Sequence, residues 1–193
     1  MRVLASNGGH YDEELFLNSY IELLTAEPAL HPDTYAESYH RGFFANLSAG
    51  KPPNRCGAVT HDTASIGGLV TVSPIAISER LRGTSLASTQ AICRKHLQLT
   101  HPDEFLAKVC DDYVALIDDL LFREAEIPVK EIIAARAKRS IGMAMPELLS
   151  KVYSDNEVVG RLFSSACYIS DSWPSVLYLA YKYAEDSRGG LLA

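Results

Sequence analysis

The 193-residue sequence predicts an all-α fold. Apolar residues recur at three- and four-residue steps through most of the chain, which is the period of an amphipathic helix. Residues that cap helices, or prolines that start them, stand before these runs, and glycine or proline follows several of them. No segment shows sustained alternation of apolar and polar residues with turn pairs of the Asn-Gly type, the pattern typical of β-hairpins.

Asp12 is expected to cap the first long helix, which ends at 27–28 because the residue before a proline avoids the helical conformation. Its expected core stripe consists of Leu15, Phe16, Ser19, Tyr20, Leu23 and Leu24. Asp33 is the N-cap candidate of the next helix, and Gly50 suits its C-terminal stop. The stripe of this second helix consists of Tyr35, Tyr39, Phe43 and Leu47. Three aromatic residues on one stripe favour packing over a ligand-binding box.

After a proline-rich loop at 51–55, Ser85 or Thr84 is expected to cap a helix that ends at 100–102. Pro102, at a first helical position, then opens the longest helix, from about 102 to 123. Pro128 precedes another helix and Pro146 starts a short one. Asp155 is expected to cap a helix that carries Val158, Val159, Leu162 and Phe163, and Asp171 is expected to cap the last.

Composition and charge exclude several classes of protein. The length suits a single domain, 1–193. The formal charge of −6 argues against binding to a nucleic-acid backbone, which needs clustered Lys and Arg. No apolar run reaches the roughly 18 residues of a membrane span, and the first residues do not resemble a signal peptide. The four cysteines form no C-x-x-C pair and are interpreted as reduced, mostly buried thiols, so we expect a cytoplasmic protein.

Four aspartates, Asp111, Asp112, Asp118 and Asp119, line one side of the longest expected helix. Carboxylates seven residues apart share a helix face, so a metal-binding pair is geometrically conceivable. A solvated polar face explains them more simply, and that interpretation is preferred.

The segment 60–68 is the least ordinary part of the sequence. Gly67 and Gly68 expose backbone N–H groups without side-chain obstruction, and with Ser65 they suit a phosphate or pyrophosphate. The equally weighted alternative is a tight contact between helices. The pattern matches neither the P-loop nor the Rossmann fingerprint.

Two histidines are candidates for a site. His61 and Asp62 form either a histidine oriented by a carboxylate or a metal-binding pair, although adjacent residues on a helix diverge. His101 stands before a helix and either faces a cleft or merely occupies the helix entrance. In the first case it is a donor whose charge depends on pH near neutrality. No pattern of residues supports nucleophilic catalysis, so no catalytic residue is assigned.

Three elements resemble the ADP-ribosylglycohydrolase and J1-crystallin superfamily. The run 60–76 resembles its central helix, which begins with a glycine-bearing loop. Leu99-Thr100-His101-Pro102 is similar to the Thr-His element that follows. The run 166–186 looks like the penultimate helix, with residues 172–175 at its entrance. An arginine common in the family is replaced around Thr71.

The resemblance implies an orthogonal multi-helix bundle around a cleft for ADP-ribose, here the central portion of the domain, truncated at both ends. The family reaction is hydrolysis of an ADP-ribosyl bond to a protein or small-molecule acceptor, so ADP-ribose or an ADP-ribosylated substrate is the implied ligand. Substrate contacts are assigned to Ser65, Gly67, Gly68 and His101. The loop would face the diphosphate, and His101 would donate to it or to a ribose, on the wall of one concave pocket.

Members of the superfamily bind two magnesium ions through an N-terminal Asp-Asp-Thr-like motif and a C-terminal Gly-Gly-Asp-x-Asp-x motif. Neither motif can be carried over to residues present here, so no metal ligand is assigned and no bound magnesium is expected in this chain. The resemblance leaves open whether the chain is an active hydrolase. The alternatives are a non-enzymatic, crystallin-like or interaction protein that keeps the fold, and a helical scaffold unrelated to the superfamily.

Overall fold

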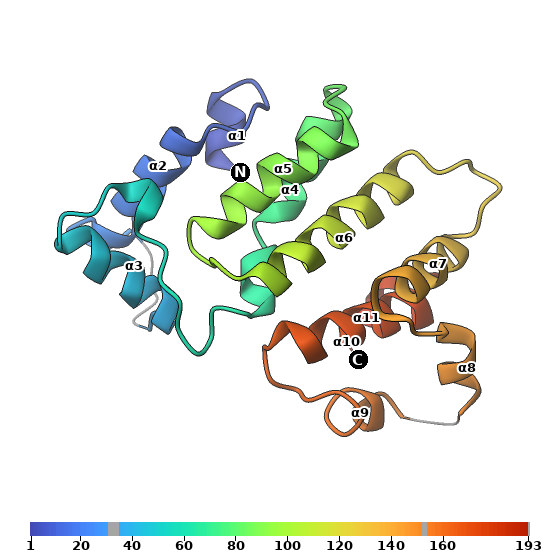
Figure 1. The fold of residues 1–193 in the computed structure, drawn as a ribbon. Helices are drawn as coiled ribbons and strands as arrows, with labels where there is room; N and C mark the ends of the chain where they lie inside the picture. The colour runs from blue at the N-terminus through green and yellow to red at the C-terminus, as the bar shows by residue number, and fades with distance from the viewer. Residues whose placement is uncertain (31–34, 152–153, 193) are drawn as a thin grey trace.

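The computed structural model describes residues 1–30, 35–151 and 154–192, and every regular element in these ranges is helical (Figure 1). The β-type pairings among the described residues are two isolated bridges, Ser65 with Tyr168 and Val159 with Phe163. The all-α class is therefore confirmed. The specific arrangement of the ADP-ribosylglycohydrolase fold stays a prediction.

The N-terminal helices are α1 (Arg2–Ser6), α2 (Glu13–Thr25) and α3 (Ser38–Ser48). Asp12 caps α2 as predicted, because its carboxylate accepts the N–H of Leu15 at 2.8 Å. The predicted stripe of α2 is wrong in part, since Leu15 and Leu23 are exposed and Leu17 is the buried residue. Leu17 belongs to a small core of its own, formed with Phe43, Cys56 and Leu99. Packing against α3 thus rotates the buried face of α2 away from the stripe expected from periodicity.

Helix α3 starts later than its sequence pattern indicates. Asp33, the expected N-cap, lies outside the described residues, and the N-cap of the observed helix is Glu37. Tyr35 precedes the helix and is 71% exposed, whereas Tyr39 and Phe43 are buried. The expected stop is observed, since Gly50 after the helix has a φ of 83°.

The middle of the chain contains two 3₁₀ turns, η1 (Pro53–Arg55) and η2 (Ile66–Leu69), followed by α4 (Val72–Leu81), α5 (Leu86–Gln98) and α6 (Glu104–Leu121). Ser85 caps α5 through the N–H of Ser88. Helix α6 is the longest of the described helices, as predicted. It begins two residues later than expected, because Asp103 accepts the N–H of Leu106 at 2.7 Å and acts as the N-cap, so Pro102 precedes the helix instead of being its first residue.

Helix α6 is the centre of the main core (Figure 1). Helices α4 and α5 pack on it from the N-terminal part of the chain. Helices α7 (Val129–Ile141) and α10 (Ile169–Lys182) pack on it from the C-terminal part. The short helices α8 (Met145–Ser150), α9 (Asp155–Val158) and α11 (Ser187–Leu192) complete this side. η2 contacts both α4 and α10, so the glycine-bearing segment lies between the two parts.

Two predictions for the C-terminal part are wrong. The helix expected after Asp155 is the four-residue α9, capped by Ser154, and a turn that starts at Gly160, with a φ of 131°, follows it. The N–H of Gly160 donates to the carbonyl of Phe163 at 2.6 Å, which closes the turn. Asp171, expected to cap the last helix, lies inside α10, where its carboxylate accepts the N–H of Ser164 at 3.1 Å.

Candidate functional site

A network of short polar side chains shapes the loop that leads to the glycine-bearing segment. The hydroxyl of Thr63 accepts the N–H of Thr60 at 2.7 Å and donates to the carbonyl of Ala58 at 3.1 Å. The carboxylate of Asp62 accepts the hydroxyl of Thr60 at 2.5 Å and the N–H of Ser38 at 3.0 Å. Ser38 is the first residue of α3, so Asp62 ties the start of that helix to the loop.

Asp62 is buried and its role is structural. Burial raises the pKa of its carboxyl, but the hydrogen bonds from Thr60 and Ser38 outweigh burial, and the pKa lies below the usual range. Its neighbour His61 is exposed. The two side chains therefore face different surroundings, and Asp62 interacts with the N-terminus of α3 rather than orienting His61.

The next residues are attached to the start of α10 by two backbone hydrogen bonds. The N–H of Ile66 donates to the carbonyl of Cys167 at 2.9 Å, and the N–H of Ile169 donates to the carbonyl of Ala64 at 2.9 Å. This short ladder places Ser65 opposite Tyr168 and fixes where η2 begins. Two segments far apart in the sequence thus hold the glycine-bearing turn in place.

Of the two interpretations of the glycine pair, a phosphate-binding turn or a tight contact between helices, Gly68 fits the tight contact. A Cβ atom at this position would lie 2.7 Å from Leu97 Cδ1, 3.0 Å from His101 Cγ and 3.1 Å from Leu106 Cδ2. The residue is buried, and its N–H donates to the carbonyl of Ser65 at 3.3 Å. Glycine is needed here because α5 and α6 approach the backbone closely.

Gly67 has different, polar surroundings. A Cβ atom at this residue would lie 3.3 Å from the hydroxyl of Tyr39, 3.5 Å from Oγ of Ser65 and 4.0 Å from Nε2 of His101. Gly67 itself is half-buried, so it reaches the surface beside these three groups. We refer to Tyr39, Ser65, Gly67 and His101 as the Gly67 cluster.

His101 is held rigidly within this cluster and is 3% exposed. Its Nδ1 shares a hydrogen bond with the hydroxyl of Thr100 at 2.8 Å, and its ring centroid lies 4.0 Å from that of Tyr39. Its Nε2 is buried and has no hydrogen-bond partner among the described residues. A buried polar atom without a partner is rare and costly, which marks this nitrogen as a candidate for binding a ligand.

The expectation that the charge of His101 changes near neutral pH is wrong. Burial lowers the pKa of its imidazole to about 4, with a further decrease from His40, and Asp62 opposes the shift. Desolvation is the main cause, since the charged imidazolium loses its hydration in this setting. His101 is therefore neutral at pH 7, with one ring nitrogen a donor and the other an acceptor.

Tyr39 is the member of the cluster that sequence reasoning missed. It was interpreted as one of several packing aromatics on α3, and nothing in that pattern distinguishes it from Phe43. Burial raises the pKa of its hydroxyl to about 12, with further contributions from Glu37 and Asp62. Tyr39 is therefore a neutral hydroxyl at pH 7 that faces Gly67.

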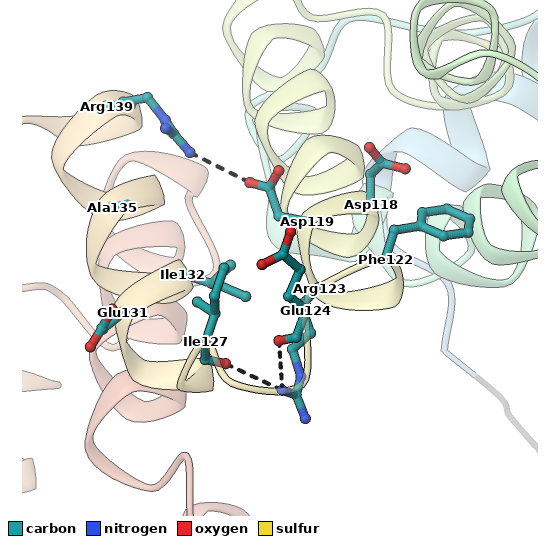
Figure 2. Close-up of a pocket in the computed structure, with 10 residues that line it drawn as sticks. All are labelled: Asp118, Asp119, Phe122, Arg123, Glu124, Ile127, Glu131, Ile132, Ala135 and Arg139. Atoms are coloured by element: carbon teal, nitrogen blue, oxygen red, sulfur yellow. Dashed lines mark hydrogen bonds and ion pairs between the residues drawn. The ribbon is translucent and has the colours of Figure 1, made fainter.

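The structure places Ser65, Gly67, Gly68 and His101 side by side, as expected, although they come from distant parts of the sequence. Their role in binding stays a prediction. A pocket of about 560 Å³ lies elsewhere, between the end of α6 and α7 (Figure 2). There Arg139 pairs with Asp119 at 3.5 Å, and Arg123 donates to the carbonyl of Ile127 at 3.2 Å. A second pocket, of about 540 Å³, lies beside the start of α2.

The four aspartates of α6 join helices rather than forming a solvated face, which corrects the preferred interpretation. Asp111 pairs with Arg94 of α5, and Asp118 pairs with Arg80 of α4 at 2.5 Å. The remaining contacts are with α7, where Arg136 and Arg139 pair with Asp119, and where Asp112 accepts the hydroxyl of Ser140 at 2.7 Å.

Across residues 1–30, 35–151 and 154–192, no three or more His, Cys, Asp or Glu side chains gather closely enough to hold a metal ion. All four cysteines are free thiols, three of them buried. In the same ranges, no helix has both the length and the apolar character needed to cross a membrane.

No model of a protein family, no curated protein and no solved structure matches the chain. The assignment to a family is therefore a proposal. It rests on the sequence elements and on the contacts they make.

Proposed function

We propose that this chain is an ADP-ribosylglycohydrolase-like protein and that the Gly67 cluster contacts ADP-ribose. The family reaction is hydrolysis of an ADP-ribosyl bond to a protein or small-molecule acceptor. One observation carries the proposal: the unpartnered Nε2 of His101 lies beside Gly67, so two of the three segments that carry the resemblance meet here. The position of the residues around it supports a binding role for Ser65, Gly67 and His101, with Gly68 providing the close packing behind them.

The residues of this chain can bind and orient a ligand. Ser65 and Tyr39 supply hydroxyl groups, and neutral His101 supplies a ring nitrogen that is already desolvated and fixed by Thr100. A fixed group gives up little conformational freedom when it binds, which favours recognition of one geometry. In the superfamily, bound magnesium would activate a water, but no metal ligands are assigned to this chain and no step is derived through the metal.

Calorimetric titration with ADP-ribose, with and without magnesium, tests the proposal. We expect weak binding that does not require magnesium. His101→Ala should weaken it about three- to tenfold, the equivalent of one hydrogen bond between neutral groups. His61→Ala is the matched control, because His61 is an exposed histidine close by in the sequence and outside the cluster. Circular dichroism of both variants establishes that the fold is retained.

The absence of any ADP-ribose binding by the wild-type chain would contradict the proposal. It would favour the non-enzymatic, crystallin-like or interaction protein instead. If His101→Ala and His61→Ala change the affinity for ADP-ribose equally, His101 does not belong to the binding site. The cytoplasmic location belongs to the same proposal, and it is supported by the four free cysteines, which suit a reducing compartment.

A further inference from the structure

Asn7 is followed by Gly8 in the turn that connects α1 to α2 (Figure 1). It is the one asparagine of the sequence with a glycine directly after it, since the other four, Asn18, Asn46, Asn54 and Asn156, precede Ser, Leu, Arg and Glu. An asparagine side chain cyclises when the backbone nitrogen of the next residue attacks its amide carbon. Glycine favours this reaction, because it has no Cβ to obstruct the approach and its backbone adopts more conformations than that of any other residue.

The fold leaves the nitrogen of Gly8 accessible. Gly8 is exposed, has a φ of 58°, and a Cβ built on it would meet no atom within 4 Å apart from its neighbours in the chain. Among the described residues, its N–H donates to no acceptor, whereas the next N–H, that of Gly9, donates to the carbonyl of Leu4 at 2.7 Å. The N–H that must lose its proton is therefore open to water and base from solution.

The side chain of Asn7 is held by one weak contact. Its Nδ2 donates to the carbonyl of His10 at 3.3 Å, which is longer than most hydrogen bonds between nitrogen and oxygen. Asn7 follows the last residue of α1 and has a φ of −114° and a ψ of 31°, outside the regular helix. Asn46, by contrast, lies inside α3, and its Nδ2 donates to the carbonyl of Cys56 at 3.0 Å. Little therefore prevents the Asn7 amide from turning toward the nitrogen of Gly8.

We propose that Asn7 is a site of spontaneous deamidation and isomerisation. The nitrogen of Gly8 loses its proton to a base in solution and forms a bond to Cγ of Asn7. The bond from Cγ to the side-chain nitrogen breaks, and that nitrogen takes up a proton and leaves as ammonia, which produces a five-membered succinimide. Water then opens the ring. Attack at Cγ gives aspartate, and attack at the main-chain carbonyl carbon gives isoaspartate, so the overall reaction consumes one water and releases one ammonia.

The modified residue lies beside the contacts that attach this turn to the end of α4. Arg82 donates to the carbonyl of Gly8 at 2.6 Å, and the hydroxyl of Ser78 donates to the carbonyl of Gly9 at 2.6 Å. Isoaspartate adds one methylene to the main chain just before Gly8, so the two carbonyls cannot both keep their positions. Either product also replaces the amide of Asn7 by a carboxylate, which has no proton to donate to the carbonyl of His10. Isomerisation should therefore loosen the turn.

The first experiment follows the folded chain during incubation at 37 °C, by proteolytic digestion and mass spectrometry. We expect the peptide that contains Asn7 to gain about one dalton over weeks and to separate into two products on chromatography. The gain should be severalfold faster at pH 8 than at pH 7, because the reaction begins with loss of a proton from an N–H. Asn18 and Asn54, which are not followed by glycine, are internal controls and should change severalfold more slowly. Asn7→Gln keeps an amide and Gly8 but must close a larger ring, so it should show no comparable gain.

The second experiment compares hydrogen exchange before and after isomerisation. The amides of Gly9 and Tyr11 donate to Leu4 and to the carboxylate of Glu79, and both should exchange faster in the isoaspartate fraction, while the amides of α6 stay unchanged. Asn7→Asp supplies the carboxylate without the longer main chain and should have a smaller effect.

No mass gain at Asn7, under conditions that convert an unstructured peptide of residues 4–11, would overturn the proposal, because the fold would then protect the residue. Equal gains at Asn7, Asn18 and Asn54 would show that Gly8 does not direct the reaction. A mass gain with unchanged exchange at Gly9 and Tyr11 would confirm the site and refute the loosening of the turn. The reaction needs no ligand, so none of these outcomes depends on the binding of ADP-ribose.

Discussion

Gly68 lies where η2, α5 and α6 meet, and replacing it by alanine measures how tightly they pack. The new methyl group would stand 2.7 Å from Leu97 Cδ1, 3.0 Å from His101 Cγ and 3.1 Å from Leu106 Cδ2. The two leucine methyl groups are flexible ends, but both leucines are buried at 1% or less exposure and have no free space to enter. The His101 atom belongs to the ring, which moves only as a whole.

Overpacking of a filled core costs about 1–3 kcal/mol. Against this, alanine reduces the conformational freedom of the unfolded chain, which stabilises the folded state by about 0.4–1 kcal/mol. We therefore expect Gly68→Ala to lower the free energy of unfolding by about 1–2 kcal/mol. Gly67→Ala is the matched control. Its methyl group would first meet the hydroxyl of Tyr39, at 3.3 Å, so we expect a loss of less than about 1 kcal/mol.

Urea unfolding measures both variants. The single tryptophan, Trp173, is 1% exposed and reports unfolding through its fluorescence. Linear extrapolation gives the free energy of unfolding in water. If Gly68→Ala proves as stable as the wild type, or loses no more than Gly67→Ala, the close approach of α5 and α6 to this glycine is refuted.

Buried and half-buried polar groups give three further predictions. Burial lowers the pKa of His96 and of His101 from 6.5 to about 4, so the unfolded state binds more protons between these values. The free energy of unfolding should therefore fall by on the order of 3 kcal/mol per histidine as pH decreases from about 6.5 to 4. Urea titrations at several pH values measure this change, and a free energy of unfolding that does not vary with pH would contradict it. Asp62→Ala removes the carboxylate at the start of α3 and should cost about 1–2 kcal/mol at pH 7. Because the folded pKa of Asp62 is depressed, this stabilisation should disappear as pH falls below about 4. If the same titrations show the same difference in unfolding free energy between the wild type and Asp62→Ala at every pH, the ionised carboxylate does not make these hydrogen bonds. Asp155 accepts the hydroxyl of Tyr178 at 2.8 Å, so Asp155→Ala should cost about 1–3 kcal/mol and speed proteolytic cleavage within 154–168; an unaltered cleavage pattern by mass spectrometry would count against it.

The sequence by itself determined where most helices lie. Asp12 and Ser85 cap the helices that follow them, and α6 occupies most of the range expected from its apolar period. These features are local, because a cap bonds to the backbone three residues on and an amphipathic stripe repeats within one helix. Such signals can be recognised without knowledge of the rest of the chain.

Features that depend on distant partners were not predictable in this way. Leu17 rather than Leu15 is buried in α2 because Phe43, Cys56 and Leu99 come from other segments. The aspartates of α6 look like a solvated face in sequence, yet arginines on three other helices pair with them. The start of α10 at Ile169 is fixed by its backbone hydrogen bond to Ala64.

The candidate site likewise has features that could be predicted from the sequence and features that depend on distant segments. Sequence reasoning selected Ser65, the glycine pair and His101, because glycines and a histidine beside a helix entrance are recognisable residue by residue. Only the tertiary structure separated the packing role of Gly68 from the polar surroundings of Gly67 and added Tyr39 to them. It also decided that His101 is neutral, since the pKa of an imidazole depends on how completely its neighbours exclude water, and those neighbours come from segments far apart in the chain.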